Sequence, residues 1–188
     1  ERPSPLTTIG LLRKHGDICV GETLRILHTH LNARGVRVLL DETTAQTYPG
    51  HAMETASRQN IGAQCDLAIV VGGDGTLLNA ARALSEYGIP LAGVNLGRLG
   101  FLADISPEMM IDRMEEILHG HYLLEERCLI SSTIERNGQK VSTSSAFNDA
   151  VIHKWNMARM IEFETYINGQ FVNSQRSDGL IVATPTGS

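Results

Sequence analysis

The chain has 188 residues, of which 42% are hydrophobic and 20% are charged, and its formal net charge is -5. This composition excludes a disordered chain, because the apolar content suffices for one large or two small hydrophobic cores. The negative net charge argues against broad binding to nucleic acids or acidic membranes, since both need a concentrated basic face.

No apolar run approaches the roughly 18 residues of a membrane-spanning helix, and the first residues lack the basic-then-apolar pattern of a signal peptide. We therefore expect a cytoplasmic protein with neither a membrane nor a nucleic-acid partner. The histidine pairs His28 and His30, and His119 and His121, have no carboxylate or cysteine cluster at ligand spacing. We accordingly expect no metal site formed by protein side chains.

The first part of the chain alternates short apolar runs with helical periodicity. Strands are predicted at residues 8–12, 36–40, 67–71 and 89–94. Helices are predicted around Leu24, Leu27 and Leu31, at residues 52–61, at residues 77–87, and from a Ser106 cap with Pro107 in the first position to a stop at Gly120. Strands alternating with helices indicate a parallel sheet, whose ligands bind at the carboxyl ends of the strands.

The pattern changes after Gly120. From Cys128 onward the apolar residues alternate at period two, and Asn137-Gly138 and Asn168-Gly169 are typical hairpin turns. We therefore predict an α/β domain with a parallel sheet over residues 1–122, followed by a β-rich, β-sandwich-like domain over residues 123–188. Some 60 residues rarely complete such a domain, so we expect it to be incomplete at its C-terminus and the chain to be a fragment of a longer protein.

The sequence Gly72-Gly73-Asp74-Gly75-Thr76 joins a predicted strand directly to a predicted helix. Such a turn points unpaired backbone N–H groups at one place, which favours phosphate. A carboxylate there repels phosphate unless a metal or a hydroxyl donor stands between them. The turn alone is also compatible with a purely structural role, because it has neither the Lys-Ser/Thr ending of a P-loop nor the three-glycine spacing of a dinucleotide fingerprint.

Further motifs surround and follow this turn in a specific order. They are Leu99-Gly100-Phe101-Leu102, Asn148-Asp149, Ser177-Asp178-Gly179-Leu180 and Thr184-Pro185-Thr186-Gly187-Ser188. Together with the glycine turn, and over nearly the whole chain, these motifs resemble the NAD kinases of the bacterial type. The turn alone also occurs in lipid kinases and phosphofructokinases.

The resemblance implies an enzyme that binds NAD between an α/β and a β domain. It implies transfer of the γ-phosphate of ATP, with a divalent metal such as Mg²⁺, to the 2'-hydroxyl of the adenosine ribose, giving NADP. It further implies that Asp74 accepts the proton of that hydroxyl and that the assembly is a homo-oligomer, a dimer or a tetramer. The residues that it places at the nucleotide sites are Gly73, Gly75, Thr76, Phe101, Asn148, Asp149, Arg159, Arg176, Asp178 and Thr186.

Elementary chemistry is consistent with one carboxylate in this role, because phosphoryl transfer depends mainly on positioning and on neutralising charge. Two alternatives remain open from the sequence. A lipid or sugar kinase would share the glycine turn but would need an apolar lipid pocket or clustered arginines. A chain whose β domain is cut short could bind nucleotide without catalysis, since the family motif after Ser188 continues with residues that contact NAD.

Overall fold

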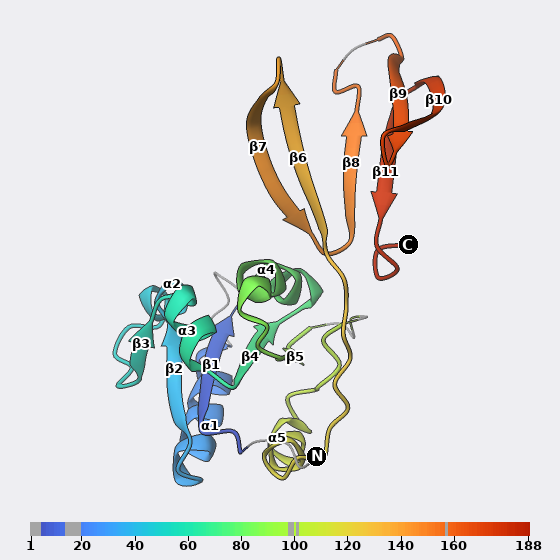
Figure 1. Ribbon diagram of the computed structural model, residues 1–188. Coiled ribbons are helices and arrows are strands. Elements are labelled where there is room, and N and C mark those ends of the chain that lie inside the picture. Colours follow the sequence, from blue (N-terminus) through green and yellow to red (C-terminus); the bar gives the residue numbers. More distant parts are fainter. Residues whose placement is uncertain (1–4, 14–19, 98–99, 101, 157) are drawn as a thin grey trace. The chain divides into compact units, whose positions relative to one another are not determined.

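The computed structural model describes residues 5–13, 20–97, 100, 102–156 and 158–188. The chain divides into two compact units, Glu1–Glu125 and Glu126–Ser188 (Figure 1). None of the helices in the described ranges is both long and apolar enough to cross a membrane.

The first unit is built on a five-stranded, entirely parallel sheet with the strand order β3-β2-β1-β4-β5 (Figure 1). Its strands are β1 (Thr8–Arg13), β2 (Arg37–Asp41), β3 (Glu54–Ala56), β4 (Leu67–Gly72) and β5 (Leu91–Asn95). Its helices are α1 (Val20–Ala33), α2 (Glu42–Gln46), α3 (Arg58–Gln64), α4 (Asp74–Leu84), the 3₁₀ helix η1 (Ser85–Tyr87) and α5 (Met110–Leu118). The predicted α/β class is confirmed.

Two apolar cores cover the two faces of this sheet. Successive side chains of a strand point to opposite faces, so Ile9 and Leu11 lie in one core and Leu12 in the other. The helices α1 and α5 complete the first core, in which Leu24, Leu27 and Leu31 are fully buried, as their spacing predicts. The helices α3 and α4 complete the second core. Both faces of the sheet are therefore covered, which suits strands that are apolar throughout.

Two predicted helices differ from the structure in detail, and one short helix was not predicted. The predicted helix at 52–61 is divided, because residues 54–56 pair with β2 and the Ser57 hydroxyl caps the start of α3 by accepting from Asn60 N. The helix predicted to start at Pro107 starts at Met110, after a tight turn of i→i+3 hydrogen bonds. The sequence reading also missed α2, a single turn capped by Asp41. Gly120, with a φ of 78°, follows the end of α5 as predicted.

The second unit contains three antiparallel strand pairs (Figure 1). They are β6 (Ile130–Arg136) with β7 (Gln139–Ala146), β9 (Ile161–Ile167) with β10 (Gln170–Ser177), and β8 (Asp149–His153) with β11 (Gly179–Ala183). The hairpin turns at Asn137-Gly138 and Asn168-Gly169 are confirmed, because all four residues have a positive φ of 52° to 78°. The second unit is β-rich, as predicted.

Asp66, just before β4, makes part of the stability of the first unit depend on pH. Its Oδ2 accepts hydrogen bonds from Thr7 N at 2.7 Å and Thr8 N at 2.9 Å, which join the start of β1 to the start of β4. The N–H of Thr8 has the largest effect on the pKa of this carboxyl, and burial opposes it; with the added hydrogen bonds from the N–H and hydroxyl of Thr7, the pKa lies below its usual range. The contribution is therefore present above the pKa that Asp66 has in the unfolded chain, and it is lost as the pH falls through the lower folded pKa.

We expect the free energy of unfolding to fall below about pH 4, and to fall less steeply in the variant Asp66→Asn, whose amide oxygen still accepts hydrogen bonds but does not titrate. Urea unfolding at a series of pH values from neutral to acidic measures both slopes. The same acid slope in the parent and in the variant would contradict this account of Asp66.

Candidate functional site

The glycine turn connects β4 to α4, as predicted. The strand β4 ends at Gly72, Gly73 is the N-cap in an extended conformation, and α4 begins at Asp74. The Gly73 carbonyl accepts hydrogen bonds from Thr76 N at 3.0 Å and Leu77 N at 3.1 Å. Asp74 therefore stands in the first turn of an 11-residue helix, where backbone N–H groups favour negative charge.

The carboxylate of Asp74 is held by the segment that follows β5. Its Oδ1 accepts hydrogen bonds from Leu102 N at 3.0 Å and from Ala103 N at 3.1 Å. Gly100 lies directly against the same carboxylate, because a Cβ built on Gly100 would overlap Asp74 Oδ1 and lie 2.7 Å from its Cγ. The backbone of Gly100, Leu102 and Ala103 thus fixes the orientation of Asp74.

The turn also forms one wall of a cavity of about 400 Å³. This cavity lies where the strand order reverses, since β1 has β2 and β3 on one side and β4 and β5 on the other. Open α/β sheets bind ligands outside the carboxyl ends of strands at such a switch point. The turn and α4 contribute Gly73, Gly75, Thr76 and Asn79 to the lining. The rest of the lining consists of Arg13, Thr43, Thr44, Thr47 and Arg58.

The cavity lining is positively charged. It contains two arginines, and none of its described residues carries a carboxylate. Arg13 ends β1, and its Nη2 donates to Thr47 Oγ1 at 2.7 Å and to the Thr47 carbonyl at 3.2 Å. Hydroxyl groups and guanidinium groups around one space are suited to phosphate oxygens.

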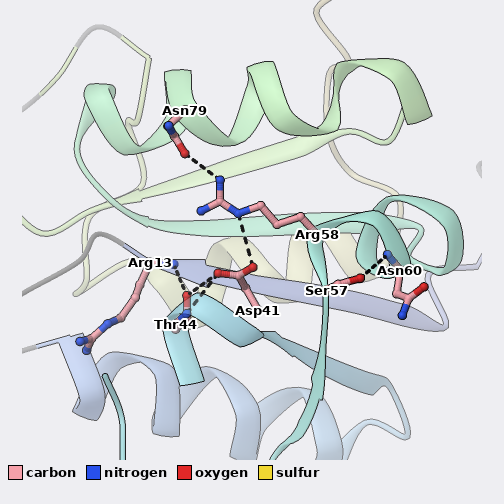
Figure 2. Close-up of polar contacts among 7 residues, drawn as sticks. All are labelled: Arg13, Asp41, Thr44, Ser57, Arg58, Asn60 and Asn79. Carbon is pink, nitrogen blue, oxygen red and sulfur yellow. Dashed lines mark hydrogen bonds and ion pairs between the residues drawn. The ribbon is translucent and has the colours of Figure 1, made fainter. Parts of the chain in front are cut away.

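Arg58 is tied to two other elements, as Figure 2 shows. Its Nε donates to Asp41 Oδ1 at 3.4 Å, and its Nη1 donates to Asn79 Oδ1 at 2.8 Å. Asp41 is 1% exposed, and its Oδ2 accepts from Thr44 N at 3.1 Å and from Thr44 Oγ1 at 3.2 Å. The guanidinium is thereby fixed between β2, the start of α3, and α4.

In the second unit, three predicted site residues come together. Asn148 and Asp149 open β8, and the pairing of Asp149 with Ala183 brings them beside the turn that follows β11. The buried Thr184 donates its hydroxyl to the Phe147 carbonyl at 2.6 Å, and its N–H donates to the Asn148 carbonyl at 2.8 Å. Thr186 lies in the same turn and accepts from Arg127 Nη1 at 3.1 Å.

The other predicted residues of this unit lie elsewhere. Asp178 lies just beyond the opposite end of the β8–β11 ladder, five residues or about 17 Å from Ala183 at the usual strand rise, and it pairs with Lys154 Nζ at 2.8 Å. Arg176, on β10, forms an exposed ion pair with Glu162 at 3.7 Å. Arg159 is exposed before β9. Phe101, the predicted wall of the nucleotide site, lies outside the described residues.

Sequence reasoning missed Arg13, Asp41 and Arg58. A usable signal was present for the first two, because Arg13 and Asp41 are the last residues of β1 and β2, at the carboxyl edge where ligands bind. No sequence pattern indicated the pairing of Arg58 with Asp41, since the two residues are 17 positions apart.

A parallel sheet with a glycine-Asp turn and an arginine-lined cavity at its switch point defines an α/β protein with a site suited to phosphate. The family model described as the ATP-NAD kinase N-terminal domain matches residues 9–122, and the model described as the ATP-NAD kinase C-terminal domain matches residues 147–188. The chain belongs to the NAD kinase family. This finding favours the predicted resemblance over the lipid-kinase and sugar-kinase alternatives.

Individual relatives of the chain are also named NAD kinase. The chain is 50% identical over 184 residues to an NAD kinase of Nitrosococcus oceani, covering 98% of this chain and 63% of the relative. It is 52% identical over 180 residues to an NAD kinase of Hahella chejuensis, covering 96% of this chain and 61% of the relative. The chain thus spans less than two thirds of the length of these curated relatives.

Two solved structures share the fold. One is the crystal structure of yeast NADH kinase complexed with NADH, with a TM-score of 0.85 and 23% identity, covering 98% of this chain and 59% of that one. The other is an NAD kinase from Archaeoglobus fulgidus in complex with ATP, with a TM-score of 0.67 and 26% identity, covering 96% of this chain and 62% of that one.

Proposed function

We propose that this chain is part of an NAD kinase that transfers the γ-phosphate of ATP to the 2'-hydroxyl of the adenosine ribose of NAD. Membership of the family supports the proposal, as do relatives at 50% and 52% identity that are named NAD kinase. The observation that carries it is the glycine turn, which presents a fixed carboxylate and also lines a cavity with two arginines.

Asp74 is the proton acceptor in this proposal. The hydroxyl oxygen of the ribose forms a bond to the γ-phosphorus, the bond from that phosphorus to the bridging oxygen breaks, and ADP leaves with the electron pair. The hydroxyl proton passes to the Asp74 carboxylate. The two N–H groups of residues 102 and 103 hold this carboxylate, so a hydroxyl that donates to it is oriented before attack.

The phosphates of the donor occupy the cavity, where guanidinium and hydroxyl groups balance their charge. The described residues contain no group of three or more histidine, cysteine, aspartate or glutamate side chains placed to hold a metal ion. Mg²⁺ commonly binds through substrate phosphates and water, and its chemical contribution is to neutralise phosphate charge. In this proposal Mg²⁺ arrives bound to the phosphates of ATP.

NAD contacts the second unit through the residues that resemble family positions. Asn148, Asp149 and Thr186 form one such group, and their closeness around the buried Thr184 supports a shared role in hydrogen bonding to the nucleotide. Gly187 fits this turn because a Cβ there would overlap the Asn148 carbonyl. The proposal also includes a cytoplasmic homo-oligomer, a dimer or a tetramer.

The proposal predicts ATP-dependent formation of NADP from NAD. The assay compares residues 1–188 with a chain extended past Ser188 to the length of the relatives, and NADP is measured with an NADP-specific dehydrogenase. We expect turnover on the order of 1 to 100 per second for the extended chain, in the range of kinases. NADP formation by neither chain, with both folded, would overturn the proposed activity. Nucleotide binding without turnover in both would favour the non-catalytic alternative.

A further inference from the structure

We propose that Arg58 binds the phosphates of the donor and that the buried Asp41 is the residue that positions it. This inference rests on the proposed function and extends it, because Arg58 and Asp41 lie outside every motif through which the chain resembles its family. The ligand class is a chain of phosphates, as in a nucleoside triphosphate.

Arg58 lies where it can contact a ligand in the cavity. It is the first residue of α3, and it lines the same cavity as Gly73, Gly75 and Thr76 of the turn. Its side chain is 33% exposed, so the guanidinium is partly withdrawn from solvent yet still accessible. An anion that contacts the turn therefore lies in the same cavity as a fixed cation.

The protein contacts of Arg58 use only some of its N–H donors. A guanidinium has five N–H groups, of which Nε donates to Asp41 and Nη1 to Asn79. Within the described ranges, Nη2 has no protein partner. The protein contacts thus fix the plane of the group and leave donors for a ligand, an arrangement suited to a phosphate that accepts two parallel hydrogen bonds.

Asp41 is a buried carboxylate that pairs with Arg58. A buried carboxylate is costly unless it is paired and fully hydrogen-bonded, and Asp41 meets this condition with Thr44 and Arg58 as partners. Asp41 does not line the cavity. It therefore pairs with Arg58 without placing its carboxylate in contact with a phosphate in the cavity. Figure 2 shows this arrangement, with Asp41 on one side of the guanidinium and Asn79 on the other.

Thr44 links the two cavity arginines. Its Oγ1 accepts from Arg13 N at 3.1 Å and donates to Asp41 at 3.2 Å. The end of β1, the end of β2 and the start of α3 are therefore joined by one hydrogen-bonded network at the edge of the cavity. Such a network keeps a binding site in its bound geometry before the ligand arrives.

The test is direct binding of inorganic tripolyphosphate and of ATP to the full-length protein, measured by titration calorimetry, together with initial-rate kinetics. In Arg58→Gln we expect the dissociation constant of tripolyphosphate and the KM for ATP to rise by about tenfold or more, since hydrogen bonds to charged groups are strong. The KM for NAD should stay unchanged. Arg58→Lys keeps the charge without the planar fork, and it should restore part of the loss.

Asp41→Asn tests positioning separately. The amide oxygen can still accept from Thr44, so the cap of α2 is kept while the charge opposite Arg58 is lost. We expect the KM for ATP to rise by about three- to tenfold, with an unchanged KM for NAD, which loss of a purely structural contact would not produce. The matched control is Arg25→Gln, which removes one charge from an exposed α1 pair with Glu22 and should bind tripolyphosphate like the parent.

The outcomes separate this inference from the proposed activity. If Arg58→Gln loses tripolyphosphate binding while the parent makes no NADP, the phosphate site stands and the kinase assignment falls. The opposite outcome is a parent that makes NADP and a folded Arg58→Gln variant whose KM for ATP and affinity for tripolyphosphate equal those of the parent. In that case Arg58 has only a structural role, and this inference is wrong.

Discussion

Replacing Asp74 with asparagine is expected to lower kcat for NAD phosphorylation by about 10²- to 10⁴-fold, the usual contribution of a positioned general base. Asparagine keeps an oxygen that can accept from Leu102 N and Ala103 N, so the turn and its hydrogen bonds are preserved. What the substitution removes is the capacity to take a proton. The dissociation constant for NAD should therefore change far less than kcat, because the lost interaction belongs to the transition state.

Single-turnover kinetics with saturating ATP, together with calorimetric binding of NAD, separate the two quantities. Asp112→Asn is the matched control, because it makes the same chemical change at an exposed carboxylate in the first turn of α5. It should retain the kcat of the parent. Equal losses of kcat and of NAD affinity in Asp74→Asn would show that Asp74 acts mainly in binding, which contradicts its role as proton acceptor.

The strands and the glycine turn could be predicted from sequence because their signals are local. The strand β4 is a run of six buried residues, and it passes at once into glycines and a helix. The Asn-Gly turns are equally local, since both positions need a positive φ that few residues adopt. In these segments the structure is determined by burial and by backbone conformation, and both can be recognised from a few consecutive residues.

Short polar elements could not be predicted in the same way. The strand β3 has only three residues, of which Glu54 and Thr55 are exposed, and the pairing with β2 alone makes it a strand. The helix α2 is one turn held by a cap from Asp41. The strand β3 depends on its pairing with β2, and α2 depends on one capping side chain. The periodicity of apolar residues therefore predicts neither element.

In the candidate site, too, the contiguous residues could be predicted and the contacts between distant residues could not. Asp74 and its glycines form a contiguous motif, whereas the hydrogen-bonding partners of Asp74 lie 28 and 29 residues further along the chain. Arg13 and Arg58, from two other elements, also line the cavity. Motifs therefore predicted the carboxylate that we propose as proton acceptor, but only the fold shows which donors orient it and which cations line the cavity nearby.

Replacing Gly100 with alanine is expected to reduce kcat by about 10- to 100-fold without unfolding the protein, because displacing a catalytic group by about 1 Å can cost 10²-fold. The new Cβ would overlap Asp74 Oδ1, so either the carboxylate rotates or residues 100–103 move away. Each response breaks the hydrogen bonds from Leu102 N and Ala103 N that orient the carboxylate. Steady-state kinetics and thermal unfolding of the same preparation measure the two effects.

Gly97→Ala is the matched control, since it adds the same methyl group in the same segment. The nearest atom to its Cβ is Asn95 Oδ1 at 3.9 Å, an ordinary contact, so its kcat should match that of the parent. The double variant Gly100→Ala with Asp74→Asn adds a further condition. If the methyl group acts only by displacing Asp74, the kcat of the double variant should be close to the kcat of Asp74→Asn alone. Full activity in Gly100→Ala, or a second loss of the same size in the double variant, would refute the orienting role of this backbone segment.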